Sequence, residues 1–61
     1  MVTKEQFVEM WNNVTDKVKR LICNNITLFA EDYELYDNSV DLYMGDRRIA
    51  TIVYDLIKEI E

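Results

Sequence analysis

The segment from Glu31 to Asp46, EDYELYDNSVDLYMGD, contains most of the side chains that could do chemistry. It carries six carboxylates and three tyrosines and has no lysine or arginine. Carboxylates can act as general acid and base, but only in a cleft that separates their pKa values. A chain of 61 residues has little volume from which to form such a cleft. Ser39 and Cys23 have no histidine to activate them as nucleophiles. We therefore expect no catalytic residue and predict that the protein is not an enzyme.

The dense acids could instead bind a cation. An EF-hand loop requires a glycine at its sixth position, and the segment that starts at Asp37 has Leu42 there. With one cysteine and no histidine, a zinc site would have to be built from carboxylates, which is unusual for zinc. We expect no metal site and no cofactor.

The negative charge of the chain is concentrated in the same segment. Of the net charge of −5, residues 31–46 contribute six acids and no bases, or −6, and the other 45 residues contribute six acids and seven bases, or +1. This balance disfavours binding to a phosphate backbone, so we expect no direct nucleic-acid ligand. No apolar run approaches the length of a membrane span. A single free thiol and an N-terminus unlike a secretory leader predict a cytoplasmic protein.

The N-terminal third has the pattern of an amphipathic helix. Thr3 and Gln6 fit a capping box, and Asn24-Asn25 fits a helix end because asparagine tolerates the left-handed conformation. Between them, apolar residues recur at helical spacing: Phe7, Met10, Trp11, Val14, Val18, Leu21 and Ile22. The central position of Trp11 in this stripe predicts a core residue.

The side chains near the end of this helix suggest structural roles. Lys17, Lys19 and Arg20 would lie in its last turns, where cations suit the helix dipole. Cys23 falls outside the apolar stripe, so we expect a surface thiol without a catalytic role.

From Ile26 the pattern changes to the period of a β-strand. Apolar residues alternate over 26–30, and Tyr33, Leu35 and Asp37 continue the alternation with the opposite parity, so we expect a bulge or tight turn at Glu31-Asp32. Asn38-Ser39 fits a two-residue hairpin loop, with Asn38 at positive φ.

This hairpin has two different faces. The loop at Asn38-Ser39 pairs Leu35 with Leu42 and Tyr36 with Asp41. The inner face then holds Tyr33, Leu35, Val40, Leu42 and Met44. The outer face holds Asp32, Glu34, Tyr36, Asp41 and Tyr43.

Gly45-Asp46 has the composition of a type II′ turn. A third strand from Arg47 to about Thr51 would follow it and place Arg48 opposite Tyr43, near Asp41. We interpret the two arginines as neutralising neighbouring acids.

The sequence leaves open whether residues 47–51 form this strand or begin the last helix. That helix is expected from about Ile52 to Ile60, where the apolar residues fit helical spacing. The expected fold is a single α+β domain over residues 1–61 in the order α-β-β-(β)-α. Two amphipathic helices would pack on one face of a short antiparallel β-meander.

The outer hairpin face is the candidate functional site, because it combines carboxylates with tyrosines, which are enriched at interfaces. We predict a non-enzymatic binding module for a basic partner protein, with these partner-binding residues: Asp32, Glu34, Tyr36, Asp37, Asp41 and Tyr43. One form of this hypothesis is an inhibitor of phage or mobile-element type that occludes a nucleic-acid-binding groove by charge mimicry. The alternative is a homodimeric structural or assembly subunit, because a chain this short can need a second copy for stability.

Overall fold

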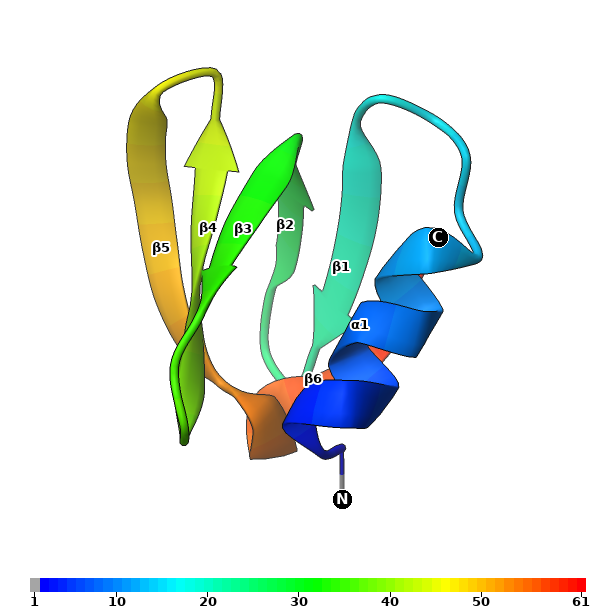
Figure 1. Cartoon of the computed structure of the whole chain (residues 1–61), viewed down its shortest axis with the longest axis vertical. Helices are drawn as coiled ribbons and strands as arrows, with labels where there is room; N and C mark the ends of the chain where they lie inside the picture. Colours follow the sequence, from blue (N-terminus) through cyan, green and yellow to red (C-terminus); the bar gives the residue numbers. More distant parts are fainter. Residues whose placement is uncertain (1) are drawn as a thin grey trace.

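The computed structural model describes residues 2–61, which form one helix and two three-stranded antiparallel sheets (Figure 1). The elements are α1 (Lys4–Asn12), β1 (Lys19–Cys23), β2 (Thr27–Ala30), β3 (Asp32–Leu35), β4 (Ser39–Met44), β5 (Arg47–Val53), the 3₁₀ turn η1 (Tyr54–Leu56) and β6 (Ile57–Ile60). One sheet has the order β2-β1-β6 and the other β3-β4-β5. The predicted fold of two helices on one face of a meander is therefore wrong, and the described chain is mostly β.

α1 begins as expected and ends much earlier. Thr3 and Gln6 form the predicted capping box, but the helix stops at Asn12, before a run of residues with poor helix propensity, Asn13 to Asp16. The apolar residues that extended the helical pattern to Ile22 belong instead to the approach to β1 and to β1 itself.

The basic residues expected at a helix end are dispersed. Lys19 is buried in β1, where its ammonium lies 5.0 Å from the ring centroid of Trp11 and donates a hydrogen bond of 2.7 Å to the carbonyl of Asp16. Lys17 forms an ion pair with Glu31, and Arg20 forms one with Glu61. The helix-dipole interpretation of this trio is wrong.

The chain passes from one sheet to the other at Glu31. β2 pairs with β1, β3 pairs with β4, and the bend between them reverses which side chains face inward. The Glu31 amide donates to the carbonyl of Tyr43, and its carboxylate accepts from the amide of Gly45. The predicted change of parity at this position is confirmed.

The β3–β4 hairpin has the predicted faces in a slightly different register. The Tyr36 amide donates to the Ser39 carbonyl, so the loop is Asp37-Asn38, one residue earlier than expected. Leu35 pairs with Val40 and not with Leu42. A slip of two residues keeps each side chain on its face. Gly45 has the only positive φ among the described residues, so the expected positive φ of Asn38 is wrong.

The β4–β5 hairpin confirms the third strand and rules out a helix beginning there. Gly45 has a φ of +64° and the following Asp46 a negative one, as a type II′ turn requires. Tyr43 pairs with Arg48, as predicted. A register shift between Leu42 and Tyr43 then marks a bulge in β5.

The predicted last helix, Ile52 to Ile60, is wrong. β5 continues to Val53, η1 turns the chain, and β6 pairs with β1. The segment is rich in β-branched residues, which favour strands. Pairing with β1 also gives hydrogen-bond partners to backbone groups that would lie unpaired at the ends of a short helix.

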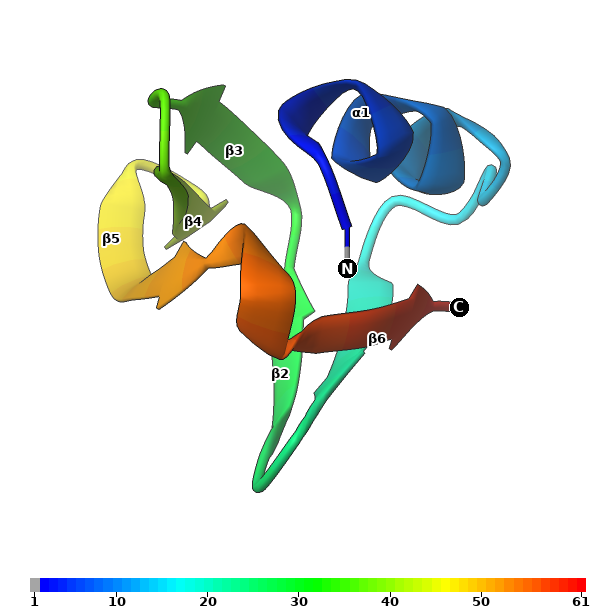
Figure 2. The ribbon, with the colours of Figure 1, turned by 90° about the horizontal axis from the view of Figure 1, so that it is seen from below.

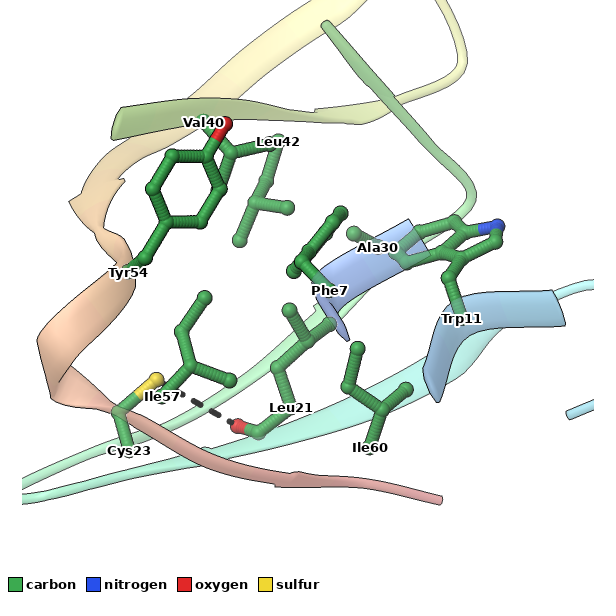
Figure 3. Close-up of a cluster of buried hydrophobic side chains, with 10 residues drawn as sticks. All are labelled: Phe7, Trp11, Leu21, Cys23, Ala30, Val40, Leu42, Tyr54, Ile57 and Ile60. Atoms are coloured by element: carbon green, nitrogen blue, oxygen red, sulfur yellow. Dashed lines mark hydrogen bonds between the residues drawn. The ribbon is translucent and has the colours of Figure 1, made fainter. Parts of the chain in front are cut away.

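The core lies between the two sheets and is closed by α1 (Figures 2 and 3). Phe7 and Trp11 of α1 both contact the ring of Tyr33 on β3, at centroid distances of 5.2 and 4.9 Å. Trp11 is thus a core residue, as predicted. The accessible surface of 4160 Å² is close to the roughly 4,200 Å² expected for a compact monomer of this mass.

Candidate partner-binding face

The candidate site is the outer face of the β3-β4-β5 sheet, called here the acidic face and made up of the six predicted partner-binding residues: Asp32, Glu34, Tyr36, Asp37, Asp41 and Tyr43. The sheet buries Val40 and Leu42 on its inner side. Cross-strand pairing places Asp32 beside Tyr43 and Glu34 beside Asp41 on the outer side. The structure therefore brings the predicted residues together, although their surroundings differ from one to the next.

Asp41 is not available to a partner in the way the sequence suggested. It is 4% exposed. Its carboxylate accepts a 2.6 Å hydrogen bond from the hydroxyl of Thr51 and a 3.4 Å contact from the guanidinium of Arg48. The expectation that Asp41 presents its charge to solvent is wrong. Its carboxylate instead links β4 to β5 through Thr51 and Arg48. The predicted proximity of Arg48 is confirmed. The role of Thr51 was missed, because it depends on the bulge that sets the register of β5.

Asp32 and Glu34 are exposed and keep their charge uncompensated. The carboxylate of Asp32 accepts from the amide of Tyr33, and that of Glu34 accepts from the hydroxyl of Tyr36. Neither lies within ion-pair distance of a lysine or arginine in residues 2–61. Alternate residues of a strand lie about 6.7 Å apart, so β3 presents two neighbouring carboxylates that have no cation partner among residues 2–61.

Asp37 lies in the β3–β4 loop and is almost fully exposed. Its carboxylate is 3.8 Å from the ammonium of Lys4, and its side chain is 98% exposed. An ion pair in such a position contributes little, so this charge also faces solvent. The open hollow beside it is lined by two more carboxylates, those of Glu5 and Asp55, and by Lys4.

Tyr36 makes three hydrogen bonds, through its amide, its carbonyl and its hydroxyl, while the residue stays 47% exposed. Its amide donates to Ser39, its carbonyl accepts a 2.7 Å bond from the hydroxyl of Tyr54, and its own hydroxyl donates to Glu34. The hydrogen bond to Glu34 is the main cause that raises the pKa of Tyr36 to about 12. The phenol is therefore a protonated, pre-oriented aromatic group.

Tyr54 fixes the backbone of Tyr36 through its hydrogen bond to the Tyr36 carbonyl, and this role was not predicted from the sequence. It is 5% exposed, and burial raises the pKa of its phenol although the bond to the Tyr36 carbonyl opposes that shift. The sequence placed it within the last helix, where no contact with the hairpin loop was foreseen. The other predicted tyrosine, Tyr43, is half-buried between Asp32 and Arg48.

Cys23 lies in the core and not on the surface as predicted. Its side chain is buried and lies beside Ile57, its cross-strand partner on β6 (Figure 3), and burial raises the pKa of its thiol. Within residues 2–61, no group of three or more histidine, cysteine, aspartate or glutamate side chains is arranged to hold a metal ion. None of the helices formed by those residues has the length and apolar character needed to cross a membrane.

Comparison of the chain with protein-family models, curated proteins and solved structures finds no match. The functional proposal therefore rests on the chemistry of the acidic face.

Proposed function

We propose that the protein is a non-enzymatic binding module that engages a basic partner protein through the acidic face. The observation that supports this most directly is the state of β3. Asp32 and Glu34 are exposed without a cation partner among the described residues, and Tyr36 lies beside them in a fixed orientation. Folding requires neither the uncompensated charges nor the exposed ring.

The proposed contact combines charge with apolar area. Arginine and lysine of the partner would meet the carboxylates of Asp32, Glu34 and Asp37, since arginine binds carboxylates with two parallel hydrogen bonds. Tyr36 and Val53, which is 46% exposed and pairs with Ser39 next to Tyr36, would supply rigid contact area. The net negative charge would also steer a basic surface toward this face.

Occlusion of a nucleic-acid-binding groove is the form of this function that we favour, because basic grooves are common on proteins that bind nucleic acid. Carboxylates would then take the positions of phosphates. The protein shares its size and charge with small inhibitors of phage and mobile-element origin. We place its action in the cytoplasm, where the single thiol stays reduced.

The test is a capture experiment with a matched pair of double variants. Asp32→Lys/Glu34→Lys reverses the exposed charges of β3, and Glu9→Lys/Glu59→Lys reverses two exposed charges on α1 and β6. Both change the net charge from −5 to −1. Proteins captured from lysate of the source organism by the wild type and the α1/β6 variant, but not by the β3 variant, are partners of the acidic face.

Competition with DNA or RNA then tests the inhibitory form. Nucleic acid should displace the protein from such a partner, and rising salt should weaken the complex. A partner captured equally by both double variants would contradict the proposal, as would a complex indifferent to salt.

A further inference from the structure

β5 is the free edge of the β3-β4-β5 sheet and lies at the outer margin of the molecule (Figures 1 and 2). It pairs with β4 on one side, and no strand of residues 2–61 pairs with its other side. A strand edge of this kind exposes unpaired amide and carbonyl groups, which can pair with another strand. At seven residues, β5 is also the longest strand of the described chain.

On the outer face of the sheet, β5 carries three exposed β-branched residues. Thr51 and Val53 pair with outward positions of β4, and the bulge adds Ile49. Ile49 is 40% exposed and Val53 46%. β-Branched side chains of this kind pack well in cross-strand pairs, and on the free side of β5 they have no neighbouring strand among residues 2–61.

The two ends of β5 carry opposite charges that have no partner within the chain. Arg47 begins the strand, and Asp55 is the second residue after its end, within η1. Neither forms an ion pair within 4.0 Å among residues 2–61, whereas Arg48 is bound to Asp41. The edge therefore has a positive end and a negative end.

We propose that two copies of the chain associate through β5 as an antiparallel pair with Thr51 near the twofold axis. This single register sets Ile49 opposite Val53 of the second copy and brings Arg47 to the end of the neighbouring strand, where Asp55 follows. Like charges stay apart, because the two Arg47 residues are separated by eight strand positions, or about 26 Å. The contact is self-complementary, as a twofold interface requires.

Association through β5 leaves the acidic face free. The two sheets would join into one, with β3 at both outer edges and about 24 Å between the two β3 strands. The dimer would present two acidic strands to a partner. The inference goes beyond the proposed function and does not depend on it, since none of the six residues of the acidic face lies on β5. Val53 is shared between the two proposals, because it would supply contact area to the partner and pair with Ile49 of the second copy.

A charge exchange tests the pairing. Arg47→Glu places an acid opposite Asp55 of the second copy, Asp55→Arg places a base opposite Arg47, and the double variant restores opposite charges. Because the twofold axis doubles each contact, we expect either single variant to weaken self-association about tenfold or more, and the double variant to recover it. Sedimentation velocity or light scattering over a concentration series measures this, and circular dichroism checks that each variant is folded.

This design separates a specific contact from a general effect of net charge. Asp55→Arg lowers the net negative charge from −5 to −3, so simple repulsion between copies predicts stronger association, and the proposed contact predicts weaker association. A wild-type chain that stays monomeric at high micromolar concentration overturns the proposal, as does a double variant that fails to recover.

A disulfide test locates the axis. Thr51→Cys should form a disulfide-linked dimer under mild oxidation, because the two introduced thiols would be cross-strand neighbours. Thr27→Cys, an exposed position on β2 of the other sheet, should not. The native Cys23 is buried and does not interfere. Equal cross-linking of both variants would contradict the placement of the interface at β5.

Discussion

Replacing Asp41 with alanine should destabilise the fold without removing a partner contact. Asp41 is 4% exposed, and its carboxylate accepts a short hydrogen bond from Thr51. A hydrogen bond to a charged group contributes about 1.5–3 kcal/mol. The Arg48 side chain is 63% exposed, so its longer contact adds little. Thr51 and Arg48 would both find water in the variant, and the removed carboxylate no longer has to be desolvated. The net loss should therefore be about 1–2 kcal/mol.

Thermal and urea denaturation measure this loss. For a domain of this size, 1 kcal/mol shifts Tm by roughly 4–8 °C, so Asp41→Ala should lower Tm by about 5–15 °C. Asp32→Ala, at an exposed position on the same face, is the control and should change stability by less than about 0.5 kcal/mol. If Asp41→Ala leaves Tm unchanged but abolishes capture of a partner, Asp41 is a presented charge and the assignment to the β4–β5 network is refuted.

Three further predictions concern single residues. The phenol of Tyr36 should titrate near pH 12 when followed by absorbance, at higher pH than an ordinary phenol, and Tyr36→Phe should remove that transition. Because folding raises the pKa of Tyr36, its contribution to stability is complete below about pH 10 and is lost as the pH rises through 12. Cys23 should react with a thiol reagent at least about a hundredfold more slowly in the native protein than in urea, because it is 6% exposed and the reagent reaches it only after local or global unfolding. Equal reaction rates in the native and denatured protein would place Cys23 on the surface. Gly45→Ala should cost about 1–2 kcal/mol because of the φ of +64°, although no atom lies within 4 Å of the added carbon; unchanged stability in urea would mean that the turn adopts another conformation.

The β3–β4 hairpin shows what the sequence could predict. Its alternation is local, and a register error of two residues leaves every side chain on its face, so the inner and outer sets were correct although Leu35 pairs with Val40. The type II′ turn at Gly45 and the pairing of Tyr43 with Arg48 were also local consequences of composition.

The overlong first helix and the predicted last helix were wrong for different physical reasons. Val14, Val18, Leu21 and Ile22 satisfy a helical period by spacing, yet Lys19, Leu21 and Cys23 are the buried face of a strand. A buried lysine hides that alternation, and its burial depends on Trp11 and the Asp16 carbonyl. The C-terminal segment is decided by pairing with β1, more than thirty residues away, which no local pattern contains. The richness of residues 49–60 in β-branched side chains was the available signal for strands.

Asp41 shows which property of the candidate site could not be predicted from the sequence. Its direction, outward from the sheet, followed from parity, but its burial follows from Thr51 and Arg48 on a strand whose register contains a bulge. Sequence periodicity predicts which face a side chain lies on and does not predict what covers it.

The most direct test of the acidic face is the affinity of its captured partner for two double variants at two salt concentrations. We expect Asp32→Lys/Glu34→Lys to raise the Kd at least about tenfold relative to Glu9→Lys/Glu59→Lys at low salt, and the ratio to shrink as salt screens the charges. Equal Kd values for the two variants, which carry the same net charge, would contradict a partner-binding role for β3.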